Sequence, residues 1–407
     1  MIQPVHACRL TSAALAALIL AACDTSTIED DGFVIDEAPR AVVTTQADDF
    51  TSGAHALVDI EAPYTTTGNL DAGESDISVT TAGEHLYKLR RFNLDTITKY
   101  SLDAPATPIW QFSTLDADDE TSANPYDLVF AAADKAYLLR YGQPDAWIVD
   151  PSVTAEADFK RGELDLSAYS PNASTNPNMA RGIVVDGKLF IAMQRFDDSF
   201  TAYDAYVAVF DTSTDTEVNT SQDPILGGIP LPVRNPLTSD DADLIYDASL
   251  GLIYVVAPGS SSFDPDTFES TPNYDGGLVT IDPVTYETTL LIDDSATTGQ
   301  ISDLVIINEQ LAYVISSAGF GNNSLYRINP RTGAFLDTDG GAPQPVAGLG
   351  GTSLTALTAD IGQRLWVGRG DGSNPGITIL DTLDDAVVQT LIPLSRNPAR
   401  IEFTNQP

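Results

Sequence analysis

The sequence contains few of the residues that most often carry chemistry or cross-link a fold. It has two cysteines, three histidines and three tryptophans in 407 residues. Cys8 precedes the amino-terminal apolar run, and Cys23 closes it, so no pair of cysteines remains beyond that point for a disulfide. The core must therefore be stabilised by burial alone. No HExxH, paired-cysteine or GxSxG motif is present, which excludes the familiar zinc and serine-hydrolase arrangements.

Positively charged residues are also scarce. The chain has 20 lysines and arginines against 58 aspartates and glutamates, which gives a formal net charge of -38 at pH 7. Only five of the 20 are lysines, and none follows Lys188. Binding to phosphate groups needs clustered lysine and arginine, so this composition disfavours nucleic acid and anionic lipid surfaces as partners.

Long helical patterns are missing from residue 40 onward. Apolar positions alternate with a period of two, and turn residues interrupt them about every eight to twelve residues. The stretch GGLVTIDPVTYETTLLID (276–293) shows the unit, in which two alternating strands are joined by a turn at Asp282-Pro283. An all-β fold is therefore expected.

The amino terminus has the pattern of a targeting segment. Arg9 precedes an apolar run of 13 residues (10–22), which is too short to span a bilayer as a helix. The run ends in Leu-Ala-Ala-Cys, which resembles the bacterial lipobox, in which the cysteine thiol is acylated before cleavage. We therefore predict a lipoprotein signal peptide over 1–22 and lipidation of Cys23. An ordinary signal peptide cleaved after Ala22 is the alternative.

Residues 23–39 predict an acidic flexible tether, because their charges repel one another and their apolar residues are too few for a core. The expected location is the cell envelope, with the protein lipid-anchored to a bacterial membrane and either periplasmic or exposed at the surface. In enteric lipoproteins an aspartate directly after the acylated cysteine, as at Asp24, is associated with the inner membrane. That rule varies between bacterial groups, so either membrane fits.

One short pattern recurs seven times from residue 40 onward, namely an apolar residue followed by a short polar residue where a strand turns. The copies are 40 to 71 residues apart, a spacing typical of propellers and solenoids. In each complete unit one strand ends at this turn, two more lie upstream of it and one follows it, which predicts a four-stranded blade. The seven copies are Ile60-Glu61, Tyr100-Ser101, Val149-Asp150, Phe210-Asp211, Ile281-Asp282, Ile328-Asn329 and Leu380-Asp381.

One unit is divided between the two ends of the chain. Residues 40–70 supply a second, third and fourth strand but no first, and NPARIEF (397–403) fits the first-strand pattern with nothing after it. Pairing these ends would close the sheet and remove exposed edges. We therefore predict a seven-bladed β-propeller over 40–407, closed by its amino-terminal strands pairing with the carboxyl-terminal strand. An open solenoid or two β-sandwiches would not need such complementary ends.

These repeats resemble the bacterial YVTN or YncE-like seven-bladed β-propellers. The resemblance is carried by the strands LIYVVAP and LAYVISS and by the turns IDPVTYE, INPRTGA and VFDTSTDTE, and it covers roughly residues 40–405. It implies the fold but not the activity, since such propellers include both binding proteins and enzymes.

The residue at the start of each predicted first strand should lie at one mouth of the central channel. Four of these seven are acidic, and oxygen-rich sites suit calcium, so we predict that they can hold a calcium ion, although no cofactor is required. The alternative is that they satisfy backbone groups at strand ends. The predicted metal ligands are Asp76, Asp127, Asp243 and Asp303, and the other three positions are Arg181, Ser353 and Arg400.

A second set of side chains falls where second strands end, on the same face. Arginine is scarce, and its repeated use at equivalent places predicts a site for an anionic ligand. The alternative is that these arginines offset nearby acids. The predicted ligand-binding residues are Arg90, Arg140, Tyr141, Gln194, Arg195 and Arg369, together with Arg181 and Arg400.

The function that needs the fewest assumptions is a cell-envelope lipoprotein whose propeller is a non-catalytic scaffold for an envelope protein or an anionic small ligand. The two histidines beyond the signal segment, His55 and His85, fall on strands, where packing is the expected role. The alternative is a propeller hydrolase or lyase acting on a lactone or an anionic glycan. It would use Asp127 or Asp303, with Arg181 or Arg400 stabilising an anionic intermediate.

Overall fold

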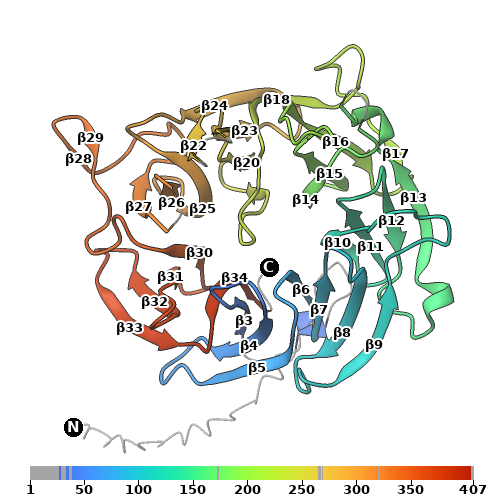
Figure 1. The fold of residues 1–407 in the computed structure, drawn as a ribbon, viewed down its shortest axis with the longest axis horizontal. Helices are drawn as coiled ribbons and strands as arrows, with labels where there is room; N and C mark the ends of the chain where they lie inside the picture. Colours follow the sequence, from blue (N-terminus) through green and yellow to red (C-terminus); the bar gives the residue numbers. More distant parts are fainter. Residues whose placement is uncertain are drawn as a thin grey trace, which may run out of the picture.

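The computed structural model describes residues 27–28, 34–35, 39–171, 174–264, 267, 269–319 and 321–404. Seven β-sheets form a ring of blades around a central channel (Figure 1). The predicted signal peptide and Cys23 lie outside the described residues, and within the predicted tether only β1 (Thr27–Ile28) and β2 (Val34–Ile35) are described, as an antiparallel pair. Over the described ranges no helix is both long and apolar enough to cross a bilayer.

The strands of each blade are given from the channel outward. Blade one is β34 (Asn397–Phe403), β3 (Arg40–Gln46), β4 (Gly53–Asp59) and β5 (Thr66–Gly73). Blade two is β6 (Ile77–Ala82), β7 (His85–Arg90), β8 (Thr96–Ser101) and β9 (Pro108–Ser113). Blade three is β10 (Pro125–Ala132), β11 (Lys135–Arg140), β12 (Asp145–Val149) and β13 (Lys160–Asp165). Blade four is β14 (Met179–Val185), β15 (Lys188–Met193) and β16 (Asp204–Asp211), with β17 (Thr216–Glu217) and β18 (Ile229–Arg234) both paired to β16.

The remaining blades follow the same order. Blade five is β19 (Ile245–Asp247), β20 (Leu252–Ala257), β23 (Gly277–Ile281) and β24 (Thr288–Asp293), with the hairpin β21 (Ser261–Asp264) and β22 (Glu269–Pro272) inserted. Blade six is β25 (Gln300–Asn308), β26 (Leu311–Ser317) and β27 (Asn323–Ile328), followed by the hairpin β28 (Thr338–Asp339) and β29 (Ala342–Pro343). Blade seven is β30 (Leu354–Ala359), β31 (Arg364–Arg369), β32 (Gly376–Asp381) and β33 (Val387–Pro393). Two short 3-10 helices are η1 (Glu156–Asp158) and η2 (Ser167–Tyr169).

The two ends of the propeller are joined within blade one. Strand β34 pairs antiparallel with β3, from Ala41 opposite Phe403 to Gln46 opposite Asn397. Figure 1 shows the red carboxyl-terminal strand beside the blue amino-terminal ones. This confirms the predicted seven-bladed ring and its closure. In blade six the outer position is filled by an irregular segment, which joins β27 through isolated bridges such as Ile328 to Phe335.

The core lies between neighbouring blades. Middle strands are covered on both faces by adjacent blades, so they are near-continuous apolar runs, as in LIYVVA (β20) and GLVTI (β23). Outer strands meet water on one face and are more exposed, as in β24 and β9. One apolar cluster spans blades four to six, and another joins blades one and seven through residues such as Val43 and Trp366. Burial on both faces is therefore what holds the blades against one another.

The recurring polar residue after each third strand forms a side-chain-capped turn. Asp211, Asp282 and Asn329 each accept hydrogen bonds through Oδ1 from backbone N–H groups two and three residues later. The fifth residue of each turn has a positive φ, for example 55° at Asp215 and 70° at Gly333. The repeat found in the sequence is therefore the chemistry of this turn.

Tyrosines of the second strands connect three of these turns to the preceding blade. Tyr254 of blade five donates its hydroxyl to the carbonyl of Pro330 in blade six at 3.0 Å. Tyr137 and Tyr313 donate to Asp215 and Asp385, which lie in the turns of blades four and seven. Each of these three hydroxyls thus satisfies its hydrogen-bonding need across a blade interface.

Candidate functional site

Blade five has the shortest innermost strand, and the segment before it enters the channel. Residues 235–244, between β18 and β19, form what we call the channel loop, drawn in yellow-green and reaching toward the middle of the ring (Figure 1). Asp241 lies on this loop. Its Oδ2 accepts the N–H of Leu357 in blade seven at 2.6 Å, and its Oδ1 accepts the N–H of Ile401 in blade one at 2.8 Å. One carboxylate thus joins three blades.

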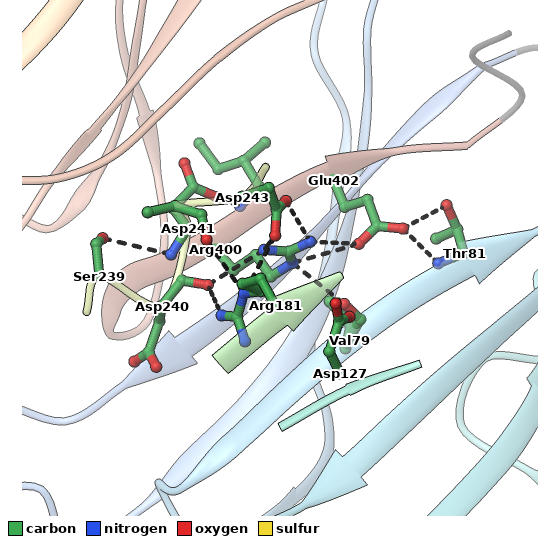
Figure 2. Close-up of polar contacts among 12 residues, drawn as sticks. Val79, Thr81, Asp127, Arg181, Ser239, Asp240, Asp241, Asp243, Arg400 and Glu402 are labelled. Atoms are coloured by element: carbon green, nitrogen blue, oxygen red, sulfur yellow. Dashed lines mark hydrogen bonds and ion pairs between the residues drawn. The ribbon is translucent and has the colours of Figure 1, made fainter. Parts of the chain in front are cut away.

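Asp243, also on the channel loop, forms the central ion pair of the channel. Arg400 of β34 donates to both of its carboxylate oxygens, at 3.1 and 2.7 Å. Arg400 also contacts Glu402 at 3.3 Å, and Glu402 in turn accepts the hydroxyl of Thr81 at 2.8 Å (Figure 2). A two-fold hydrogen bond of this kind fixes geometry as well as charge, so the loop is held in one position.

Arg181 of β14 is the second channel arginine, and its side chain is almost entirely buried. Its guanidinium donates to the carbonyls of Tyr126, Ala180, Asp240 and Ala242 at 2.9 to 3.2 Å. It also lies 3.1 Å from Asp243. The guanidinium therefore has five acceptors around it, which belong to the channel loop and to the neighbouring blades.

The predicted acids Asp127 and Asp303 lie on the innermost strands of blades three and six and are both buried. Asp127 accepts its own neighbour's N–H, from Leu128, and that of Gly182 in the next blade at 3.0 Å. Asp303 accepts only Leu304 N–H, and its Oδ2 has no partner among the described residues. Burial raises the pKa of Asp127, and burial together with Asp241 raises the pKa of Asp303 well above its usual range.

Two further buried acids share this environment. Burial raises the pKa of Asp241 to about 7, against the opposing effect of Arg400 and the two N–H donors. Burial also raises the pKa of Glu402. The channel therefore holds several carboxyl groups in low-dielectric surroundings, balanced by two arginines.

Asp76 extends this network toward blade two. Arg91 contacts Asp76 at 2.5 Å and Asp240 of the channel loop at 2.8 Å, and its guanidinium lies 4.7 Å from the centre of the Tyr126 ring. Tyr126 stacks on Tyr141 at 4.3 Å. The Tyr141 hydroxyl then donates to Gln194, whose amide donates to the carbonyl of Pro236. Tyr141 and Gln194, both predicted site residues, therefore help to hold the channel loop in place.

The other predicted arginines lie within their own blades. Arg90 contacts Asp71 and Thr98. Arg140 is fully buried, pairs with Asp145 and Asp119, and lies 4.5 Å from the Trp147 ring centre.

Arg195 and Arg369 complete the predicted set. Arg195 donates to the carbonyls of Tyr169 and Asp204 and lies over the Tyr206 ring. Arg369 is the last residue of β31, and the next residue, Gly370, lines a cavity at one mouth of the channel. Binding of an anion by these arginines stays a prediction.

Carboxylates suited to a metal ion come together at one place in the described chain, and it is away from the channel. Asp116, Asp145 and Glu163 can place one oxygen each within 4.8 Å of one another. Lys160 contacts Asp116 at 2.5 Å and also contacts Glu163, and Arg140 pairs with Asp145, so cationic side chains already neutralise this group. No three of the predicted ligands Asp76, Asp127, Asp243 and Asp303 meet that distance. Calcium at the channel mouth stays a prediction.

Both histidines pack within the fold. His55 is fully buried and its Nε2 lies 2.8 Å from the carbonyl of Pro105. Burial lowers the pKa of His55 and of His85 to about 4. Neither side chain is therefore tuned as a general base near neutral pH.

Cavities lie on both sides of the channel loop. The upper cavity, of about 470 Å³, is lined by Thr238, Ser239 and Asp240 of the loop. Two lower cavities, of about 330 and 440 Å³, are both lined by Asp243. Asp241 also lines the first, and Asp127, Arg400 and Glu402 also line the second. The channel loop thus lies between an upper and a lower mouth.

Solved structures share this architecture. The chain is a seven-bladed β-propeller. Periplasmic gluconolactonase PpgL of Pseudomonas aeruginosa is 13% identical, with a TM-score of 0.54 over 91% of this chain and 99% of that one. A protein of Bacteroides uniformis, provisionally named a 6-phosphogluconolactonase, is 12% identical, with a TM-score of 0.55 over 90% and 100% of the two chains.

A third solved structure carries a different name on the same fold. Dihydro-heme d1 dehydrogenase NirN is 11% identical, with a TM-score of 0.53 over 91% of this chain and 76% of that one. No protein-family model matches the chain, and no curated protein matches it in sequence. Identities this low show the β-propeller fold alone, and the activity has to be argued from the site.

Sequence reasoning missed Asp240, Asp241 and Glu402 of this propeller. Asp240 and Asp241 belong to the polar run SDDADL (239–244). If the strand after this run were short, its serine and three aspartates would lie together at one mouth of the channel. Glu402 alternates with the apolar residues of β34 and could have been placed on the channel side with Arg400. What could not be foreseen is that the loop enters the channel.

Proposed function

We propose that this protein is a cell-envelope lipoprotein, similar to YncE-like propellers, whose propeller binds a small polar ligand without catalysis. The upper cavity is the observation that carries this proposal. It is lined by hydroxyl, amide and glycine residues from blades one, five, six and seven, with the carboxylates of Asp48 and Asp240. Concave sites of this size with several convergent polar groups are typical of ligand binding.

The direction of the chain supports an anchored scaffold. All second strands run the same way along the channel axis, so the loops that join second to third strands, here called the 2–3 loops, emerge on one face. The upper cavity is lined by 2–3 loop residues such as Asp48, Gly319 and Gly370, whereas β3 begins at Arg40 on the opposite face. A lipid on Cys23 would therefore connect to the face away from the cavity, through a tether that can extend roughly 55–60 Å.

The lining of the upper cavity indicates the class of ligand. Among its described residues it has serines, threonines, asparagines and two aspartates, but no lysine, arginine or histidine. Hydroxyl and amide groups both donate and accept, which suits a polyhydroxylated ligand, and carboxylates repel an anion. We infer a neutral or cationic sugar-like ligand here. The anionic ligand expected from the arginines stays a separate prediction, since those side chains are paired with acids.

Calorimetry with three matched hexoses tests this proposal. Glucosamine, glucose and glucuronate share a ring and differ in charge. With the chain from residue 24 onward, we expect affinity in that order, and Asp48→Asn should weaken glucosamine binding about tenfold, as expected for a lost charge-assisted hydrogen bond. Asp134→Asn, an exposed acid on the opposite face, is the matched control. Preferred binding of glucuronate, or no binding at all, would contradict the proposal.

Lactone hydrolysis is the second candidate function, and one observation favours it. Asp241 and Asp303 are buried acids with raised pKa values, as a general acid requires, and Asp241 lines a lower cavity. One solved propeller of similar fold is named a gluconolactonase. Hydrolysis of glucono-δ-lactone tests this candidate, and it can be measured at pH 7 through the proton that the product acid releases. Activity that disappears in Asp303→Asn would favour the enzyme, and a parallel calcium titration of the same variant tests the predicted metal site.

A further inference from the structure

The exposed aromatic side chains of the described chain all lie in the 2–3 loops. Phe50, Phe92, Phe200 and Phe263 are 56%, 59%, 86% and 61% exposed, and they belong to blades one, two, four and five. We call them the rim phenylalanines. The remaining exposed aromatic, Tyr274, is in the same loop as Phe263. The other exposed apolar side chains are aliphatic, and two of them, Leu383 and Val284, lie in turns on the opposite face.

Phe50 and Phe200 are held at their loop tips by the same construction. The sequences are DDFTS (48–52) and DDSFTA (197–202). In each loop the phenylalanine N–H donates to the carbonyl three residues earlier, at 2.9 and 2.8 Å, and an aspartate Oδ1 accepts from the following threonine N–H. Asp197 N–H also bonds to the carbonyl of Thr201, which closes the turn. The backbone at both loop tips is therefore held by hydrogen bonds within its own loop.

The backbone of both residues is in the left-handed region, with φ of 58° at Phe50 and 60° at Phe200. That region suits glycine or asparagine, and a bulky side chain there costs stability. Exposure to water adds a second cost, because an aromatic ring buries the most apolar area of any side chain when covered. Two costs at equivalent places in two blades indicate a function that uses the exposed rings.

The charge beside these rings is negative. Asp48, Asp49, Asp197, Asp198 and Asp264 lie in the same loops. Hydrogen bonds within the loops, from Thr51 to Asp49 and from Thr201 to Asp197, lower the pKa of both aspartates, so both stay ionised in mild acid. Arg195, at the base of one loop, already donates to two backbone carbonyls. The rim thus presents apolar rings surrounded by carboxylates.

We propose that the rim phenylalanines form a docking surface for a basic partner protein, whose apolar side chains cover the rings and whose lysines or arginines face the aspartates. Aromatic anchors within a charged rim are how protein interfaces gain affinity and specificity. A second copy of this chain would bring like charges together, and an anionic membrane would be repelled. Phe50 also lines the upper cavity, but Phe92, Phe200 and Phe263 do not, so most of this docking surface lies outside the site proposed for the sugar-like ligand.

Photo-crosslinking of the full-length protein in the cells that naturally produce it tests this proposal. The photoreactive amino acid p-benzoylphenylalanine replaces Phe92 or Phe200, which preserves an aromatic side chain at an exposed position. The matched control places it at Leu383, which is 90% exposed on the opposite face. Adducts are identified by mass spectrometry, and the yields are compared in an otherwise identical chain carrying Asp49→Lys and Asp198→Lys.

The expected result is one adduct, with the same protein from positions 92 and 200, at a yield at least about tenfold above that from position 383. That protein should have a pI above about 9, and the two lysine substitutions should lower the yield at least about threefold. Equal adducts from position 383, an adduct with a second copy, an acidic protein, lipid or glycan, or no adduct would each overturn the proposal. Hexose calorimetry on the same variants reports separately on the upper cavity, so the two proposals can fail independently.

Discussion

Single tyrosine hydroxyl groups add hydrogen bonds across blade interfaces that are otherwise apolar. Tyr313 donates to Asp385, a carboxylate that also pairs with Arg327 at 3.1 Å, whereas Tyr254 donates to a neutral carbonyl. Hydrogen bonds to charged groups contribute more to stability than those between neutral groups. We therefore expect Tyr313→Phe to lower the free energy of unfolding by about 1.5–3 kcal/mol and Tyr254→Phe by about 0.5–1.5 kcal/mol. Urea unfolding of the two variants measures both values, and equal losses would show that the carboxylate adds nothing.

Asp241 makes stability depend on pH in an unusual direction. Its pKa is about 7 in the folded protein, against about 4 for an aspartate in an unfolded chain. Between these values the folded state holds the proton that the unfolded state has lost, so stability falls as pH rises. The difference corresponds to at most about 4 kcal/mol. Asp127, Asp303 and Glu402 act in the same direction, and we expect the melting temperature to fall from pH 5 to pH 8.

A matched pair of amides isolates the contribution of Asp241. Asp241→Asn cannot ionise, so its melting temperature should change less between pH 5 and pH 8 than that of the unmodified chain. Asp282, whose pKa is lowered by backbone N–H groups in its turn, is ionised in both states throughout this range. Asp282→Asn should therefore leave the slope unchanged. Scanning calorimetry at several pH values measures how the melting temperature of each of the three chains changes with pH. If Asp241→Asn changes as much as the unmodified chain, the other buried acids cause the pH dependence.

The arginines show that a sequence pattern can predict where a side chain lies on a strand but not which acid it pairs with. The strand positions predict Arg181 at one mouth of the channel and Arg140 at the end of a second strand on the same face. Arg181 lies there, but Arg140 pairs with Asp119 and Asp145 within blade three. Their sequence positions predict the end of a strand at which each lies, not which carboxylates will reach the guanidinium. Those partners come from loops whose paths depend on the assembled ring.

At the scale of elements, β34 completes blade one and also contributes to the channel. It pairs with β3 along its length, provides Arg400 to Asp243, and donates Ile401 N–H to Asp241. A chain ending at Ser395 would expose a sheet edge and remove the partners that β34 supplies to Asp241 and Asp243. We expect it to aggregate or to melt at least about 10 °C lower, and a synthetic peptide of residues 396–404 should restore solubility.

The same peptide with Arg400→Gln is the matched control for that experiment. Asp243 is 38% exposed and keeps Arg181, so the loss of Arg400 should cost less than the roughly 3–5 kcal/mol of a fully buried ion pair. We expect this peptide to bind at least about tenfold more weakly. Fluorescence anisotropy of labelled peptides measures both affinities. A truncated chain that melts like the intact one would show that ring closure does not stabilise the propeller.

The strands were predictable because their pattern is local, while the channel loop was not. Alternation and repeated Asx turns placed six of the seven innermost strands, and the unpaired terminal fragments predicted that β34 joins β3. The channel loop has no periodicity, and its decisive contacts, from Asp241 to Leu357 and Ile401, join residues 116 and 160 positions apart. Such contacts exist only once the ring has closed, so no window of sequence contains them.

For the whole molecule, the dominant feature is a formal charge of -38. Like charges spread over a compact surface repel one another and destabilise the folded state, and salt screens them, with a Debye length of about 10 Å at 0.1 M and 3 Å at 1 M. We therefore expect the melting temperature to rise by about 5 °C or more between 0.05 and 1 M NaCl. Exposed ion pairs contribute little to stability, so their loss in salt should not reverse the rise in melting temperature.

A charge-reduced variant separates this surface effect from the buried ion pairs of the channel. Glu84, Asp134 and Glu287 are exposed in turns on the face opposite the cavity. Converting them to glutamine, asparagine and glutamine should raise the melting temperature at 0.05 M NaCl but not at 1 M, because only the unscreened repulsion is relieved. Differential scanning calorimetry at both salt concentrations measures this. A melting temperature that falls with salt would mean that the ion pairs around Arg181 and Arg400, rather than surface repulsion, control the stability of the propeller.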